Sequence, residues 1–353
     1  MDKDKLKTAV LGLNHEGLLL LEAALQTELF QIQAVADKDS AVAETTGKKY
    51  DCAHYDDYRR LLTTTELDCL IVAAGLYSCH EQLRMAMKKK LHILKAAPAG
   101  RNFEEAAEYV NTAQQENVRF AIACAKRFGQ SYNVFRDFLR EVMDEQSGVL
   151  TSICNYGDCA RPAWHSDPKL AGGGVLLRDC YEIIDQIVYN FWLPQQVYTA
   201  NNSMAEDKKH RQYLTEDTAI VTMKFSDTLV GNMVVSRVFG PRQEFLRLCG
   251  KNRILTVTDN KVLISTTSSG RIIKRRLFND NRLRWCREMV TNFALSILQP
   301  DKNELCNSAK DNLLNMAVIE AAYLSARTGM PEQPSRILEM ALGSAGKKTA
   351  SER

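Results

Sequence analysis

Residues 12–17 read Gly-Leu-Asn-His-Glu-Gly and lie between an apolar run and an apolar stretch with helical spacing. Gly12 and Gly17 stand where a dinucleotide-binding turn has its first and third glycines, which make the tight turn and allow close helix–strand packing. Asn14 replaces the middle glycine, which normally lets the backbone approach the pyrophosphate. Because asparagine tolerates left-handed backbone better than most residues, the turn can still form. The pattern predicts a nucleotide-binding fold and leaves open whether a nucleotide binds.

An acidic residue, Asp37, ends the second apolar run of the chain. A carboxylate in that place can accept hydrogen bonds from the adenosine ribose hydroxyls and disfavours a 2′-phosphate. We therefore expect NAD rather than NADP, although Lys38 beside it softens this discrimination. A helix from Gly17 would direct its amides at the pyrophosphate, whereas Glu16 places negative charge there. The alternative is a vestigial turn that binds no nucleotide.

The first 125 residues alternate short apolar runs with longer amphipathic stretches, which indicates βαβ units and a parallel sheet. The expected strands cover 7–12, 30–37, 67–74, 92–95 and 118–124, and the expected helices 17–27, 79–89 and 103–115. We predict a Rossmann dinucleotide-binding domain over residues 1–125.

After about residue 130 the pattern changes to closely spaced apolar runs with turn signals between them, which suits antiparallel neighbours. Strands are expected at 148–156, 196–200, 218–225, 231–238, 245–249, 253–259 and 262–266, and helices at 132–143, 172–192, 285–298 and 310–328. The prediction is an α+β domain over 126–340, built on a large, mostly antiparallel open-faced sheet, and a polar tail over 341–353. Because one sheet layer cannot bury both faces by itself, we expect a homodimer or homotetramer.

Composition excludes several classes of partner. The formal net charge is only +3, so no polyanion is expected, and the basic residues between 271 and 284 are interpreted as a solvated rim rather than a nucleic-acid site. No signal-like segment or membrane-length apolar stretch is present. The ten cysteines lack CxxC pairs or zinc-like spacing, which predicts free thiols, no metal site and a cytoplasmic protein.

Further short motifs follow one another in a fixed order along the chain. They lie at 35–37, 55–58, 67–74 (followed by His80), 164–168, 172–176, 216–219 and 325–329. With the glycine turn, this order resembles the Gfo/Idh/MocA family, the glucose–fructose oxidoreductase and inositol dehydrogenase group, over residues 6–338. The resemblance implies a Rossmann domain that carries NAD(P), with cofactor contacts extending to Ala74, His80 and Ala97. It also implies a sheet domain that covers the nicotinamide and often packs against another subunit.

The implied reaction is reversible hydride transfer at a carbon of a sugar, an inositol or a related alcohol, but the catalytic positions of the family are altered. The usual Glu-Lys-Pro is Ala-Ala-Pro at 96–98, and Ala97 can play no acid/base role. The usual histidine is Glu182, three residues before the retained Asp185. Arg178 lies four residues before Glu182, so the two could form a salt bridge on one helical face that keeps Glu182 ionised.

Several other groups could take over the displaced proton-transfer role. Lys95 shares a strand face with Ala97, Tyr181 could donate a phenolic proton, and His165 precedes the glycine triplet and can titrate near neutral pH. Together with Glu182 and Asp185, these are the candidate catalytic residues, expected where the fifth strand ends and the 178–185 helix lies. The alternative function is a non-catalytic family scaffold that binds a small metabolite or a partner.

Overall fold

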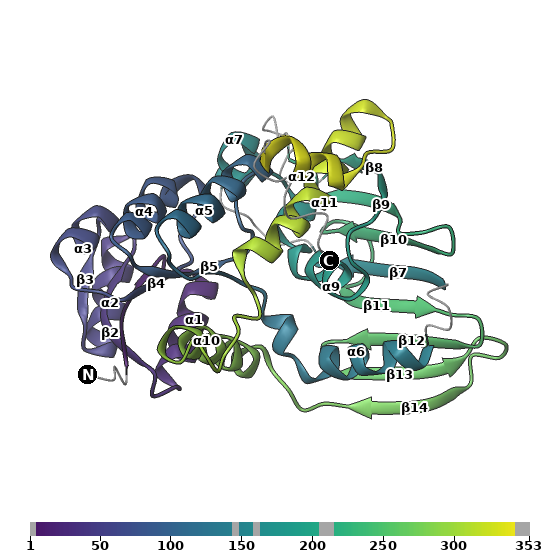
Figure 1. Ribbon diagram of the computed structural model, residues 1–353, viewed down its shortest axis with the longest axis horizontal. Helices are drawn as coiled ribbons and strands as arrows, with labels where there is room; N and C mark the ends of the chain where they lie inside the picture. Colours follow the sequence, from purple (N-terminus) through teal and green to yellow (C-terminus); the bar gives the residue numbers. More distant parts are fainter. Residues whose placement is uncertain (1–4, 143–147, 158–162, 205–214, 343–353) are drawn as a thin grey trace. The chain divides into compact units, whose positions relative to one another are not determined.

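The computed structural model describes residues 5–142, 148–157, 163–204 and 215–342 (Figure 1). The chain forms two compact units, and each unit consists of three separate stretches of the sequence. The first unit contains residues 1–99, 108–128 and 281–312, and the second contains 100–107, 129–280 and 313–353. The linear division expected at residue 125 therefore leaves out the return of 281–312 to the first unit.

The first unit is built on a six-stranded parallel sheet with strand order β3-β2-β1-β4-β5-β6. The strands are β1 (Leu6–Leu11), β2 (Phe30–Ala36), β3 (Ala53–Tyr55), β4 (Cys69–Val72), β5 (His92–Ala96) and β6 (Phe120–Ala123). Every residue of β4 and β6 is buried, as expected of strands in a parallel sheet that is covered on both faces.

Helices connect these strands in the right order for a Rossmann fold. They are α1 (His15–Leu25), α2 (Ser40–Tyr50), α3 (Tyr58–Thr64), α4 (Leu76–Lys88) and α5 (Phe103–Gln115), whose first residues belong to the second unit. A short 3-10 helix, η1 (Ala125–Phe128), follows β6, and α10 (Arg282–Leu298) packs against α1. The predicted Rossmann domain is confirmed.

The second unit is built on an eight-stranded sheet with strand order β14-β13-β12-β11-β7-β10-β9-β8. Neighbours are antiparallel except for β7 and β10, which are parallel. The strands are β7 (Gly148–Asn155), β8 (Gln196–Asn202), β9 (Thr218–Lys224), β10 (Leu229–Ser236), β11 (Gln243–Cys249), β12 (Arg253–Thr258), β13 (Lys261–Thr266) and β14 (Ile272–Leu277). The predicted mostly antiparallel sheet is confirmed.

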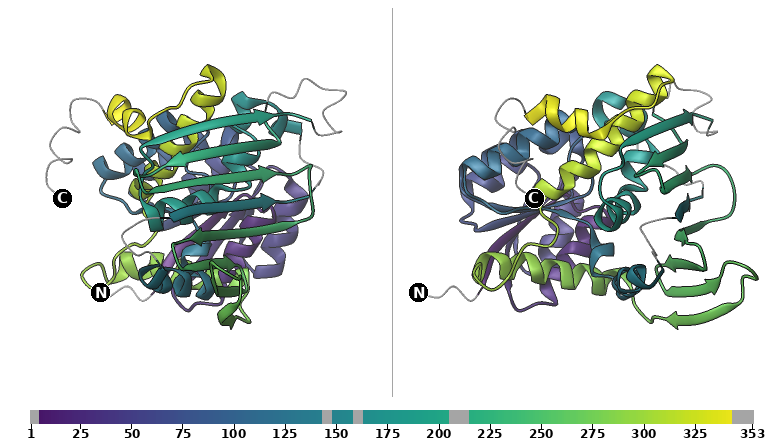
Figure 2. Two further views of the ribbon diagram at one scale, coloured as in Figure 1. Left: turned by 90° about the vertical axis from the view of Figure 1, so that its right-hand side faces the viewer. Right: turned by 45° about the vertical axis from the view of Figure 1, so that its right-hand side comes forward.

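Helices of the second unit cover one face of this sheet. They are α6 (Gln130–Val142), which packs on β12, and α7 (Pro168–Ala171), α8 (Val175–Arg178), α9 (Tyr181–Phe191), α11 (Ala309–Thr328) and α12 (Pro334–Leu342), with η3 (Ala163–Ser166) before α7. Side chains of α8, α9 and α11 meet those of β9 and β10 in an apolar interior. The opposite face of the sheet is turned toward the viewer in the left view of Figure 2.

One strand of this unit was not predicted, and one predicted helix is wrong. The basic segment interpreted as a solvated rim is exposed, as expected, but it also forms a strand that was not predicted, the edge strand β14. The single helix expected over 172–192 is broken between α8 and α9, because the Cys180 amide donates to the carbonyl of Val175, five residues earlier, and its thiol donates to Leu176. Arg178 and Glu182 therefore lie on different helices, and the i,i+4 argument for their salt bridge does not apply.

Candidate functional site

The glycine turn follows β1, and both of its glycines are required by the backbone around them. Gly12 has φ of +85°, and a Cβ at this position would lie 2.3 Å from the Ala74 amide nitrogen. A Cβ on Gly17 would lie 1.9 Å from the Gly12 carbonyl oxygen. The turn is thus packed between the end of β4 and the start of α1, as the dinucleotide-binding pattern demands.

Asn14 serves this turn differently from the expectation. Its φ is −66°, so the left-handed tolerance of asparagine is not used. Its Oδ1 accepts a hydrogen bond from the Gly17 amide at 3.0 Å, and its Nδ2 donates to the Ala73 carbonyl at 2.8 Å. Asn14 is the N-cap of α1, a position that favours asparagine, and it ties the helix to the end of β4.

Asp37 lies at the end of β2 and is hydrogen-bonded to the glycine turn. Its Oδ2 accepts from the Leu13 amide at 2.7 Å, and its Oδ1 accepts from the Asp39 amide at 3.0 Å. Burial and the nearby Asp37 carboxylate raise the pKa of the Tyr58 hydroxyl. Next to this group is an open cavity of about 560 Å³ lined by Lys38, Asp56, Asp57, Tyr58, Arg59, Ser78 and Gln82. The carboxylate and the cavity fit the adenosine half of a dinucleotide.

An ion pair at the amino end of α1 could not be foreseen from local sequence. Glu16 accepts from the Arg282 guanidinium at 3.1 Å, and the two residues are 266 positions apart. Arg282 begins α10, which packs on α1. The arginine therefore offsets the negative charge that Glu16 brings to the glycine turn.

The carboxyl ends of β5 and β6 each carry a buried lysine. The Lys95 ammonium donates to the carbonyl oxygens of Ala96 and Pro98, which flank the half-buried Ala97. Lys126 in η1 is 6% exposed, and its Nζ lies 5.7 Å from the centre of the Trp285 ring. Lys126 was not predicted from the sequence, although a charged residue at the end of the apolar run 120–125 is a usable signal.

His80 lies on α4 and contacts the next helix of the same unit. Its Nδ1 is 2.9 Å from the Tyr109 hydroxyl, and the two rings pack at 5.5 Å between their centres. This contact pairs α4 with α5. Its predicted role in cofactor binding stays a prediction.

In the second unit, the glycine triplet 172–174 precedes α8, and each glycine has its own steric reason. Gly172 has φ of +80°, and a Cβ there would lie 2.1 Å from the Arg101 carbonyl oxygen. A Cβ on Gly173 would lie 2.1 Å from the Tyr323 hydroxyl oxygen, and one on Gly174 would lie 1.8 Å from the Glu216 carbonyl oxygen. The loop is therefore held by backbone and side chains from three other segments.

Two of the predicted catalytic residues of this unit are deeply buried. Tyr181 is 1% exposed and Asp185 is fully buried. Asp185 Oδ1 accepts a hydrogen bond from the Asn315 side chain at 2.8 Å. This contact joins α9 to α11, which favours a structural role for Asp185.

The other two, His165 and Glu182, are half-buried. The His165 ring packs edge-on against Trp164 with 4.0 Å between the ring centres. The Arg178 guanidinium makes a cation–π contact with Trp164, because it lies 4.6 Å from the centre of the Trp164 ring. His165 and Glu182 are thus the predicted residues of this unit that retain access for a ligand.

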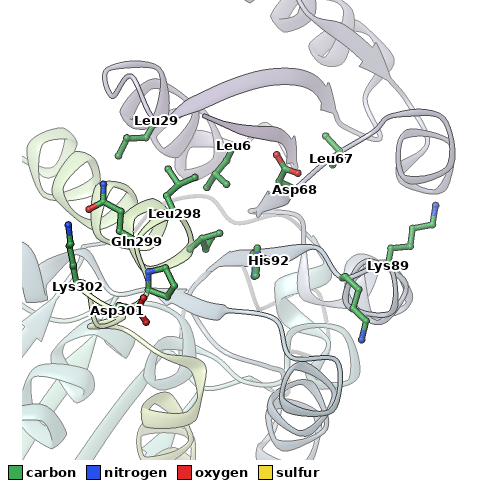
Figure 3. A pocket seen from close by; sticks show the side chains of 13 residues that line it. Leu6, Leu29, Leu67, Asp68, Lys89, His92, Leu298, Gln299, Asp301 and Lys302 are labelled. Carbon is green, nitrogen blue, oxygen red and sulfur yellow. The ribbon is translucent and has the colours of Figure 1, made fainter. Parts of the chain in front are cut away.

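A larger cavity, of about 940 Å³, lies at the amino ends of the strands of the first sheet (Figure 3). It is lined by the beginnings of β1, β4 and β5, including Leu6, Asp68 and His92, and by residues 297–302, which end α10 and follow it. The glycine turn follows the carboxyl end of β1, whereas Leu6 begins that strand. The size of this cavity therefore does not mark it as the nucleotide site, because ligands of open α/β sheets bind at the carboxyl ends of the strands.

The described part of the chain contains no cluster of three or more histidine, cysteine, aspartate or glutamate side chains arranged to hold a metal ion. Among these same residues no helix is both long and apolar enough to cross a membrane. The cysteines among the described residues are free thiols.

A parallel sheet whose glycine turn is anchored to an acidic residue after the second strand defines a dinucleotide-binding class of fold. Residues 6–124 match the NAD-binding Rossmann domain of the Gfo/Idh/MocA oxidoreductase family, and residues 149–333 match its C-terminal alpha/beta domain. The chain therefore belongs to the Gfo/Idh/MocA oxidoreductase family.

Individual relatives are distant. The chain is 23% identical over 200 residues to the NADP(+)-dependent scyllo-inositol 2-dehydrogenase IolU of Bacillus subtilis, which covers 54% of this chain and 60% of that protein. It shares its fold with levoglucosan dehydrogenase in complex with NADH and levoglucosan (TM-score 0.83, 13% identity, 93% of this chain and 99% of the other). An oxidoreductase from Agrobacterium radiobacter, in complex with NAD+, L-tartaric acid and magnesium, is also similar (TM-score 0.78, 15% identity, 94% and 99%).

Proposed function

We propose that the protein is a nicotinamide-dependent oxidoreductase that moves a hydride between the cofactor and an alcohol carbon of a sugar, an inositol or a related polyol. The observation that carries the proposal is the glycine turn, which keeps Gly12 and Gly17, with Asp37 hydrogen-bonded to it beside an open cavity. Inositol and levoglucosan dehydrogenases among the relatives support the class of substrate.

The cofactor, when bound, would supply the hydride acceptor. The turn at 12–17 and the first amides of α1 would hold its pyrophosphate, and Asp37 would bind the adenosine ribose. Oxidation of an alcohol releases a hydride from carbon and a proton from the hydroxyl oxygen. Ala97 cannot take that proton, so we assign the role to His165 or Glu182. The Lys95 ammonium, bonded to the carbonyls on both sides of Ala97, would hold this loop in place.

Direct binding and turnover measurements test the proposal. Purified protein is titrated with NADH and with NADPH while nicotinamide fluorescence is followed, and NAD+ reduction is then assayed with scyllo-inositol, myo-inositol and levoglucosan. We expect NADH binding and slow turnover, because the loss of one acid/base group typically costs about 10²–10⁴-fold in rate. Binding without any turnover would favour the non-catalytic scaffold, and absence of binding would contradict both cofactor and activity.

Replacement of Asp37 by alanine is expected to erode the preference for NADH over NADPH. A hydrogen bond to a charged group contributes about 1.5–3 kcal/mol, which corresponds to roughly 10–100-fold in affinity. The ratio of the two dissociation constants measures the effect. Asp39→Ala is the matched control. It removes a neighbouring carboxylate whose side chain caps α2 and does not accept from the glycine turn. Wild-type protein that binds NADPH as tightly as NADH would refute the role of Asp37.

We further propose that the open face of the eight-stranded sheet binds a second copy of this chain. Apolar side chains on four neighbouring strands are exposed there: Val149 by 46%, Tyr198 by 46%, Ile220 by 51% and Val230 by 42%. Alternate residues of β9 (Ala219, Val221 and Met223) are buried under the helices, so the sheet is apolar on both sides. Burial of the open face against another copy would remove it from water.

Replacement of Ile220 by arginine is therefore expected to convert a dimer or tetramer into smaller species. The charge would be buried at the centre of the contact, which is strongly unfavourable without a partner. Light scattering at micromolar concentration measures the mass. Leu25→Arg, a change of the same kind at an exposed position in the first unit, should leave the mass unchanged. A monomeric wild-type protein would count against the interface.

A further inference from the structure

Glu216 lies just before β9, and its buried side chain is hydrogen-bonded to the glycine loop. Its Oε2 accepts from the Gly174 amide at 2.8 Å, and its Oε1 accepts from the Leu176 amide at 2.9 Å. Its own carbonyl accepts from the Val175 amide at 3.0 Å. One residue therefore satisfies three successive amides at the start of α8.

Tyr323 of α11 completes this arrangement. Its hydroxyl donates to Glu216 Oε1 at 2.9 Å and packs directly on Gly173. Burial raises the pKa of the Glu216 carboxyl group, and the hydrogen bonds from Leu176, Tyr323 and Gly174 act in the opposite direction. Because each of these partners donates, the ionised carboxylate is the form that satisfies all of them.

The residue before Glu216 contacts His165, one of the two half-buried candidates for proton transfer in this unit. The Thr215 hydroxyl donates to the carbonyl oxygen of His165 at 2.9 Å. Residues 215 and 216 are thus bonded to the backbone of His165 on one side and to the start of α8 on the other. α8 leads directly to the break at Cys180, and Glu182 is the second residue of the helix that follows, α9.

We propose that Glu216, together with Tyr323, is a positioning residue that sets the geometry of His165 and Glu182 for proton transfer. This inference rests on the proposed oxidoreductase function. It predicts that Glu216 affects turnover through the placement of other groups and leaves cofactor binding by the first unit unchanged.

Steady-state kinetics of Glu216→Gln tests the proposal. The amide group presents one donor where the structure needs an acceptor, so the glycine loop is expected to shift. Displacement of a reacting group by about 1 Å can cost about 10²-fold, and we expect a fall of that order in kcat, with a smaller change in KM and no change in NADH affinity. Tyr323→Phe keeps the ring and loses one hydrogen bond, so a smaller fall in kcat is expected.

Glu320→Gln is the matched control, because Glu320 is a partly buried carboxylate on the same helix as Tyr323 and is paired with Arg327. Unchanged kcat in both Glu216→Gln and Tyr323→Phe would overturn the proposal, as would losses in kcat matched by the control. If Glu216→Gln does not fold, the kcat of Tyr323→Phe decides.

Hydrogen exchange of the 174–176 amides separates this inference from the proposed function. Faster exchange is expected there in Glu216→Gln, with unchanged exchange in the first unit. If wild-type protein shows no turnover, the oxidoreductase proposal fails, and the exchange rates still decide whether Glu216 fixes the loop. Unaltered exchange at these amides would overturn the positioning role.

Discussion

Replacing Ala97 by lysine and Glu182 by histidine together is expected to raise polyol dehydrogenase activity by about 10²–10⁴-fold, the usual contribution of a positioned acid/base group. Ala97 is half-buried and flanked by the two carbonyls that hold the Lys95 ammonium. Glu182 is half-buried at the start of α9. Both positions are therefore partly exposed. NADH formation with scyllo-inositol and levoglucosan measures the gain.

Ala97→Met is the control, because it adds similar volume without a group that transfers protons and leaves Glu182 in place. Replacement of Arg178 is a separate experiment. Its guanidinium lies over the Trp164 ring, and Arg178 and Glu182 belong to different helices. A restored variant that binds NADH but shows no gain over the control would contradict the oxidoreductase proposal and favour the non-catalytic scaffold.

Gly12→Ala is expected to abolish measurable NADH binding and to lower the free energy of unfolding. An L-residue in the left-handed region costs about 1–2 kcal/mol, and overpacking against the Ala74 backbone costs about 1–3 kcal/mol more. The clash lies at the turn itself, 2.3 Å from a backbone nitrogen, so only movement of the turn or of the end of β4 relieves it. Fluorescence titration and urea unfolding measure the two effects.

Gly270→Ala separates backbone strain from the clash. Gly270 also has a positive φ, +68°, but nothing lies within 4 Å of a Cβ built there. It should show the strain alone and leave NADH binding intact. If Gly12→Ala binds NADH as the wild type does, the turn is not the pyrophosphate site.

The parts of the site that follow from short segments of sequence were predictable. Gly12, Gly17 and Asp37 occupy fixed places relative to two strands, because a tight strand-to-helix turn limits which residues can stand there. The alternation of helices and strands likewise predicted the parallel sheet. For Asn14 the residue was identified but its task was not, because N-capping and left-handed backbone both favour asparagine.

Local sequence determined the Rossmann domain and the mostly antiparallel sheet. Only the tertiary structure decided the pairing of Glu16 with Arg282, the break before α9 and the hold of Glu216 on the glycine triplet. The physical reason is range. Turns, caps and strand alternation depend on neighbours within a few residues, whereas a buried carboxylate or an ion pair depends on which distant segments the fold brings together.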